Sequence, residues 1–160
     1  VAALENPSVR TLTVIDVMEP VIDWHRRGLV PLGKELTSDP RCSLVLADFF
    51  AVAASASGGF TSAVPTPLVH AILLDIDHSP SNWLNPGNGD FYTEQGLRNL
   101  ADKLYPGGIF GLWSDDPPDA AFTALLDSIF ASSEAHIVNF PNPYTGGESS
   151  NTVYLAHKGK

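Results

Sequence analysis

Hydrophobic residues are concentrated in short runs along the chain, rich in leucine, valine and isoleucine and separated by polar or glycine- and proline-rich segments. Runs of about four to eight such residues are typical of buried strands. The pattern predicts strands at residues 12–17, 43–46, 71–75, 109–113, 136–139 and 152–156.

Between these runs, apolar residues follow the spacing of a helix. Residues 21–27, closed by Gly28, and residues 49–55 predict two short helices. Thr93 is a suitable N-cap for a helix that reaches residue 104, and Pro118 is a suitable start for another. The glycine-, serine- and proline-rich segments predict a flexible connection at 55–67, a loop at 78–90 and a turn at 106–108.

Strands that alternate with helices predict an α/β fold in which a mostly parallel sheet is covered on both faces. The last two strands are joined by a loop at residues 142–151, and we expect them to form an antiparallel hairpin. No internal repeat is present, so the sequence predicts a single domain over residues 1–160.

Composition narrows the classes of function. The chain has 160 residues, of which 44% are hydrophobic and 17% charged, as in a packed globular protein. A net charge of −9 makes nucleic acid a poor partner and suits a cationic ligand such as a sulfonium or a polyamine, unless the acidity only maintains solubility. No apolar run of about 18 residues predicts a membrane span, and the single Cys42 fits a reducing cytoplasm.

Acidic residues recur where predicted strands end, and open α/β sheets bind ligands at that edge. Asp16 either binds a ribose diol or caps the following helix, and Asp48 either accepts a hydrogen bond from adenine or caps its helix. Asp115 and Asp116 either cap the helix that begins near Pro118 or line an acidic substrate-binding rim.

Asp75, Asp77 and His78 form the densest cluster of ionisable residues. Asp75 directly follows a buried strand, and burial would make it a competent proton acceptor. Asp77 and His78 either hold and deprotonate an amine or belong to a network that pins the long loop. The five histidines are scattered without metal-ligand spacing, so we predict no metal site.

The ordered set of these segments resembles the Rossmann-like domain of the spermidine synthase (polyamine aminopropyltransferase) family, within the S-adenosylmethionine-dependent methyltransferase superfamily. The segments that carry the resemblance are Val14-Ile-Asp-Val-Met-Glu-Pro-Val-Ile-Asp-Trp-His-Arg26, Leu44-Val-Leu-Ala-Asp-Phe-Phe50, Ala71-Ile-Leu-Leu-Asp-Ile-Asp-His78 and Leu104-Tyr-Pro-Gly-Gly-Ile-Phe110. They extend over nearly the whole chain.

The resemblance implies specific roles. Asp16 would bind the ribose and Asp48 would approach the adenine of decarboxylated S-adenosylmethionine or S-adenosylmethionine. Asp75 would deprotonate an attacking amine. Apart from the resemblance, we predict Asp77 and His78 as further catalytic residues, and Asp115, Asp116 and Tyr144 as substrate-binding residues for a small cationic amine or a nucleoside.

The chain departs from the family in three ways. No glycine precedes Gly28, so the glycine-rich loop and the strand before it are lacking. We therefore expect either re-pairing of the sheet or its completion by another subunit in a homo-oligomer. His78 occupies a position where the family usually has an acid, and the family's N-terminal β domain is absent.

Three other functions compete with aminopropyl transfer. Methyl transfer uses the same fold, and a non-catalytic ligand-binding or assembly module would keep the fold without turnover. The third is an esterase-like hydrolase with Ser79 or Ser114 as nucleophile and His78 as base.

Overall fold

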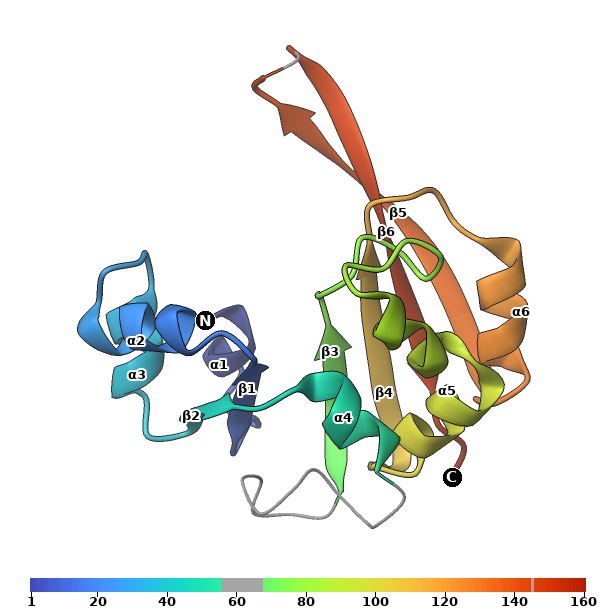
Figure 1. The fold of residues 1–160 in the computed structure, drawn as a ribbon, viewed down its shortest axis with the longest axis horizontal. Helices are drawn as coiled ribbons and strands as arrows, with labels where there is room; N and C mark the ends of the chain where they lie inside the picture. The colour runs from blue at the N-terminus through green and yellow to red at the C-terminus, as the bar shows by residue number, and fades with distance from the viewer. Residues whose placement is uncertain (56–67, 145) are drawn as a thin grey trace. The chain divides into compact units, whose positions relative to one another are not determined.

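A computed structural model describes residues 1–55, 68–144 and 146–160 (Figure 1). The described chain forms two compact units: residues 1–52 make up the first, and residues 53–55 and 68–160 the second. The flexible connection predicted at 55–67 lies almost entirely outside the described residues. The single domain predicted over residues 1–160 stays a prediction.

The first unit is built on a pair of parallel strands, β1 (Leu12–Asp16) and β2 (Cys42–Leu46). Their register runs from Leu12 opposite Cys42 to Asp16 opposite Leu46. Helix α1 (Ala2–Glu5) precedes β1, and α2 (Glu19–Arg27) and α3 (Gly33–Ser38) connect the strands. Helix α2 ends where the sequence predicts, because Gly28 takes a φ of 65°, in the left-handed region that favours glycine. The short, polar α3 was not predicted.

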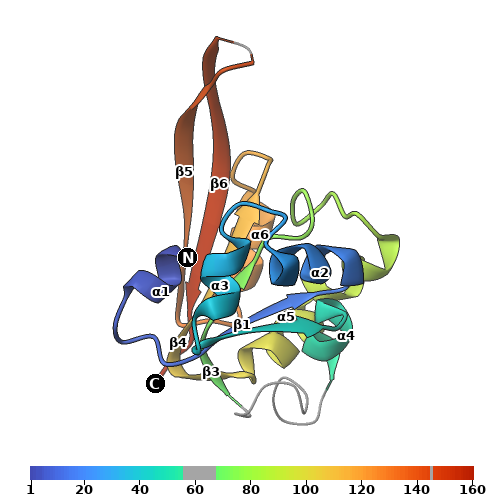
Figure 2. The ribbon, with the colours of Figure 1, turned by 90° about the vertical axis from the view of Figure 1, so that its left-hand side faces the viewer.

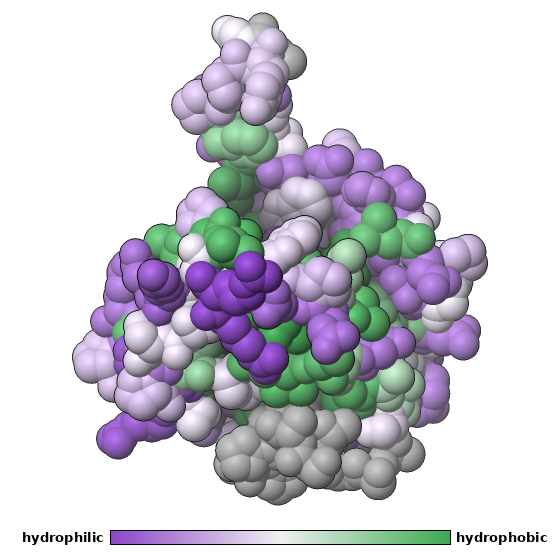
Figure 3. Space-filling model, turned by 60° about the vertical axis from the view of Figure 1, so that its left-hand side comes forward, coloured by the Kyte–Doolittle hydropathy of each residue, from purple (hydrophilic) through white to green (hydrophobic). Residues whose placement is uncertain are grey.

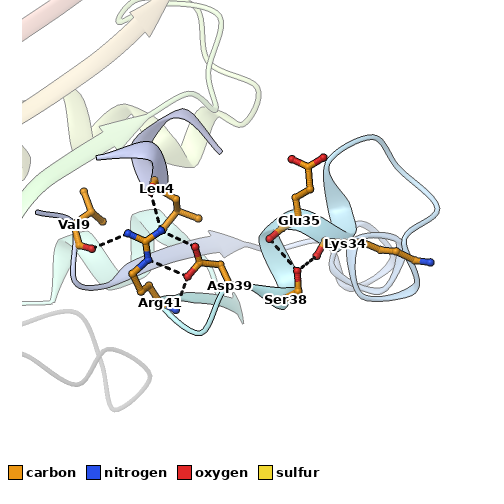
Figure 4. A network of polar contacts seen from close by, with 7 residues as sticks. All are labelled: Leu4, Val9, Lys34, Glu35, Ser38, Asp39 and Arg41. Carbon is orange, nitrogen blue, oxygen red and sulfur yellow. Dashed lines mark hydrogen bonds and ion pairs between the residues drawn. The ribbon is translucent and has the colours of Figure 1, made fainter. Parts of the chain in front are cut away.

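Arg41 fastens the N-terminal segment of this unit to the start of β2 (Figure 4). Its guanidinium donates to the carbonyl oxygens of Leu4 at 2.7 Å and Val9 at 3.2 Å, and to both carboxylate oxygens of Asp39. The hydrogen bonds that Asp39 accepts from the Arg41 side chain and backbone lower the pKa of the Asp39 carboxyl.

The second unit is a mixed sheet in the order β3-β4-β6-β5. Strand β3 (Val69–Leu74) is parallel to β4 (Leu104–Ser114). Strands β5 (Ser132–Asn142) and β6 (Gly147–His157) form the predicted antiparallel hairpin, and β6 lies against β4. The α/β fold with a parallel part and a C-terminal hairpin is confirmed.

Helix α4 (Phe49–Ala54) belongs mostly to the first unit, and only its last two residues belong to the second. The other helices of the second unit are the 3₁₀ helix η1 (Pro86–Tyr92), α5 (Glu94–Ala101) and α6 (Ala120–Asp127). Aromatic rings join η1 and α6 to the sheet. Phe110 of β4 contacts Phe91 of η1, and Phe122 of α6 meets Tyr154 of β6 edge-on at 5.1 Å. The core of the unit therefore lies on this face of the sheet.

Three local predictions need correction. The helix predicted to reach residue 104 ends at Ala101, and β4 begins at Leu104. Residues 78–90, predicted as a loop, include most of η1 because Asn85 caps it, accepting a hydrogen bond from the Gly87 amide. The predicted turn at Pro106–Gly108 lies within β4 instead, where the register with β3 shifts and Gly107 takes a φ of 76°. A bulge accommodates the extra residues without ending the strand.

The hairpin continues beyond the sheet as a two-stranded arm (Figures 1 and 2). Strand β4 pairs with β6 only from Ile109 opposite His157 to Ser114 opposite Thr152. The residues of β5 and β6 beyond that point pair only with each other, up to Asn142 opposite Gly147. We call residues 138–144 and 146–151 the arm.

The described strands form two separate sheets, and no strand of the first unit pairs with one of the second. The expectation that the sheet re-pairs within the chain is therefore wrong for the described residues. Completion of the sheet by another subunit stays a prediction. No helix in the described part of the chain is long and apolar enough to span a membrane.

Candidate functional site at the strand ends

Asp75 follows the last residue of β3 and is exposed. The burial predicted for it is wrong, because only Ile72 and Leu74 of this strand point into the core. Within the described residues, its carboxylate makes no hydrogen bond or ion pair. A free carboxylate at the carboxyl end of a parallel strand is in the place where open α/β sheets bind ligands.

Asp77 is fully buried, with 1% of its surface exposed. Its carboxylate accepts hydrogen bonds from the Leu84 amide at 2.8 Å, the Asn88 side chain at 2.8 Å and the Tyr92 hydroxyl at 2.9 Å. Burial raises the pKa of Tyr92, and the neighbouring Asp77 charge raises it further, so this hydroxyl remains a donor at neutral pH. Asp77 therefore fixes the path of the chain from β3 to η1, and its proposed contact with an amine stays a prediction.

The acids that follow β4 are held beside the loop after β3. The Asp115 amide donates to the His78 carbonyl at 2.7 Å, which joins the two strand ends. The Asp115 carboxylate accepts from the Asn151 side chain at 3.2 Å. The carbonyl of Asp116 accepts from the Thr152 hydroxyl, and its exposed carboxylate has no partner among the described residues.

One alternative was that Asp115 or Asp116 caps α6, but neither residue does. Asp119 is the cap: its Oδ1 accepts from the amides of Ala121 at 2.8 Å and Phe122 at 3.2 Å. Asp115 and Asp116 are thus left at the sheet edge, next to the segment that carries Asp75 and His78. His78 is exposed and its ring has no hydrogen-bond partner in the described chain.

In the first unit, Asp16 and Asp48 lie at the carboxyl ends of two neighbouring parallel strands. The Ala47 amide donates to the Asp16 carbonyl at 3.1 Å, which extends the β1–β2 ladder to this point. Oδ1 of Asp16 accepts from the Met18 amide, and Oδ1 of Asp48 accepts from the Phe50 amide at 2.9 Å. In both residues, Oδ2 has no hydrogen-bond partner within the described residues, so each acid combines local capping with one free acceptor.

Tyr144 is not brought to this edge. It lies in the turn at the tip of the arm with 97% of its surface exposed. Five residue steps along β6 separate the tip from the last pair with β4, roughly 17 Å at the rise of a strand. The structure therefore gathers Asp75, His78, Asp115 and Asp116 in the second unit but leaves Tyr144 outside that group.

The serines considered as nucleophiles are both buried. Ser79 has Ser81 as its hydroxyl partner, and Ser114 contacts the backbone of Asp116. Neither forms a hydrogen bond to a histidine within the described chain. In that same part of the chain, no three His, Cys, Asp or Glu side chains are grouped as metal ligands would be.

Sequence reasoning missed the residues that support the site. Asn88 and Tyr92 hold Asp77, and the Tyr92 ring is stacked against Trp83 at 6.2 Å between centroids. An Asn followed by an aromatic pair in a loop gives no periodic signal, so only the tertiary contact identifies their role.

Comparisons with known proteins identify the fold. No protein-family model matches the sequence, and no curated protein matches it. Among solved structures, spermidine synthase from Thermotoga maritima superimposes with a TM-score of 0.67 at 19% identity, covering 98% of this chain and 48% of that one. Spermidine synthase in complex with the transition state analogue AdoDATO gives 0.66 at 19% identity, over 98% of this chain and 49% of that one.

Human methyltransferase-like protein 13 in complex with SAH gives 0.61 at 16% identity, covering 92% of this chain and 61% of that one. The chain has the Rossmann-like methyltransferase fold. It spans about half the length of the spermidine synthase structures. In a Rossmann-like sheet the carboxyl ends of the parallel strands form the ligand-binding edge, and the candidate acids occupy those ends.

Proposed function

We propose that the chain is the adenosyl-sulfonium-binding part of a transferase that moves an aminopropyl group from decarboxylated S-adenosylmethionine to an amine. The observation that carries this proposal is the exposed carboxylate of Asp75 at the end of β3, which has no partner among the described residues. Similarity of fold to two spermidine synthases supports the choice of reaction.

In this reaction the amine nitrogen attacks the aminopropyl carbon bound to sulfur. The new C–N bond forms as the C–S bond breaks. The electron pair of the C–S bond remains on sulfur, which becomes a neutral thioether. Asp75 accepts the proton that the amine loses, and Asp115 and Asp116 favour the cationic amine by their charge. No metal or redox partner is needed for the atoms and charges to balance.

The nucleoside would be held by the first unit. Ribose hydroxyls and the adenine amino group are hydrogen-bond donors, and Oδ2 of Asp16 and of Asp48 are acceptors without a partner in the described chain. The donor and acceptor types therefore fit, with Asp16 on the ribose and Asp48 near the adenine. Cytoplasmic localisation is consistent with these ligands and remains part of the proposal.

Methyl transfer is the second candidate, favoured by the similarity to human methyltransferase-like protein 13 in complex with SAH. Titration calorimetry with decarboxylated S-adenosylmethionine, S-adenosylmethionine and methylthioadenosine separates the two. Tighter binding of the decarboxylated ligand, weakened by Asp16→Ala, supports aminopropyl transfer, and preference for S-adenosylmethionine supports methyl transfer. Absence of binding by all three at millimolar concentration supports a non-catalytic module instead.

The role of Asp75 is tested by the rate of transfer to a polyamine acceptor. Asp75→Asn should lower kcat by about 10²–10⁴-fold, the usual contribution of a general base. Asp102→Asn is the matched control, because Asp102 is also an exposed acid but precedes β4 instead of following a strand. Equal rates for Asp75→Asn and the unaltered chain would refute the assignment.

A further inference from the structure

Strand β5 is the outer strand of its sheet, and one of its two edges carries no strand partner among the described residues. It pairs with β6 in an unbroken register from Ser132 to Asn142. Natural edge strands are usually protected by lysine, by proline, by bulges or by shortness. β5 contains no lysine or arginine, has no bulge, and carries proline only near its end, at Pro141.

The side chains of β5 also leave apolar surface exposed. Ile137 is 61% exposed, and Val138 and Phe140 are exposed as well. Figure 3 shows hydrophobic surface where the arm leaves the rest of the second unit. A long, unprotected and partly apolar edge is a template for pairing with another strand.

The hydrogen-bonding side chains of β5 are self-complementary. Glu134 and His136 lie two residues apart, so they share one face of the strand, and their side chains are in contact at 2.8 Å. In antiparallel pairing about a twofold axis at Ala135, Glu134 faces the partner's His136, and His136 faces the partner's Glu134. Ser133 then faces the partner's Ile137, and no two like charges are opposed.

We propose that two copies of this chain associate through β5, in antiparallel register about Ala135, to form one continuous sheet. A twofold contact uses the same surface on both copies, so each favourable cross-strand pair is formed twice. The other outer strand, β3, is less suited, because it is shorter, has a register shift and leads into Asp75. This inference does not depend on the proposed transferase activity.

Sedimentation of the full 160-residue chain tests which edge is used. Ile137→Lys adds an edge-protecting charge to β5, and Leu73→Lys, at a residue 73% exposed on β3, is the matched control. We expect a dimer whose dissociation constant rises about tenfold with Ile137→Lys and is unchanged with Leu73→Lys. Circular dichroism checks that both variants are folded.

A monomer at all concentrations overturns the proposal. So does a dimer that dissociates with Leu73→Lys but not with Ile137→Lys, because it would place the contact on β3.

Cross-linking tests the register. In a Cys42→Ser background, Ala135→Cys places two thiols opposite each other, at the Cα separation of about 4.5–5.5 Å that a disulfide accepts. Ser133→Cys is the control, since residue 133 faces residue 137 of the copy. Rapid disulfide formation by Ala135→Cys alone supports the register, and equal or faster formation by Ser133→Cys overturns it.

Discussion

Replacing Tyr92 by phenylalanine removes one hydrogen bond from the buried Asp77 carboxylate and changes little else. The Tyr92 ring stays available to stack on Trp83 and to pack against Phe91 and Phe122. Asp77 then keeps two donors, the Leu84 amide and the Asn88 side chain. The substitution therefore isolates the contribution of the hydroxyl at 2.9 Å from the carboxylate.

A hydrogen bond to a charged group contributes about 1.5–3 kcal/mol. Because the Asp77 carboxylate is buried, it cannot replace the lost hydrogen bond with one to water. Tyr92→Phe should lower the free energy of unfolding of the second unit by that amount. Tyr105→Phe is the control, because the Tyr105 hydroxyl has no hydrogen-bond partner in the described chain and that variant should change stability by less than about 0.5 kcal/mol.

Alkaline pH gives an independent readout. Unfolded tyrosine loses its proton near pH 10, whereas burial and the Asp77 charge raise the pKa of folded Tyr92. Above pH ~10 the unfolded state therefore binds fewer protons than the folded state, and the free energy of unfolding falls by about 1.4 kcal/mol per pH unit for each such tyrosine. Tyr92→Phe should reduce this slope. Part of the slope should remain in this variant, because burial also raises the pKa of Tyr154.

The assay is urea unfolding followed by tryptophan fluorescence, since Trp83 is stacked on Tyr92. The reasoning is refuted if Tyr92→Phe and Tyr105→Phe unfold at the same urea concentration, or if the alkaline slope is the same with and without the Tyr92 hydroxyl.

Three further outcomes follow from local geometry. Asp119→Ala should lower the free energy of unfolding, measured by thermal unfolding, by about 1 kcal/mol because the α6 cap is lost. Asp116 does not cap α6, so Asp116→Ala should have a smaller effect. A larger loss for Asp116→Ala than for Asp119→Ala would contradict the cap assignment. Gly96→Ala should destabilise by about 1–3 kcal/mol although alanine favours helices, because its Cβ would fall against the backbone of Phe91, at 2.7 Å from Cα. Arg41→Lys should speed amide hydrogen exchange in residues 1–11, since an ammonium cannot reproduce the planar contacts to two carbonyls and Asp39; unchanged protection would show that the segment is held otherwise.

The sequence by itself determined the order and type of most elements, because their hydrophobic periods are strong. The runs at 12–17, 43–46 and 71–75 are rich in leucine, isoleucine and valine, which favour strands, and they form β1, β2 and β3. Thr93 was identified as a cap from residue type alone, and its hydroxyl accepts from the Gly96 amide. The placement of acids at strand ends followed from the same pattern, since the apolar run ends where the chain leaves the sheet.

Only the tertiary structure decided how each acid is used. Asp75 and Asp77 are two residues apart and look equivalent in sequence, yet one is exposed and the other is buried. The difference comes from Asn88 and Tyr92, which reach Asp77 from η1, eleven and fifteen residues along the chain. Contacts over such separations leave no trace in local periodicity.

The same limit applies to the sheet. Sequence pattern predicted six strands, but it carried no information on which edges would lack a partner. Strands pair only when folding brings them together. The open edge of β5 and the division into two sheets are therefore visible only in the tertiary structure. Residue type and spacing therefore determined which groups are available at the strand ends, and long-range packing decided which of them remain free to act.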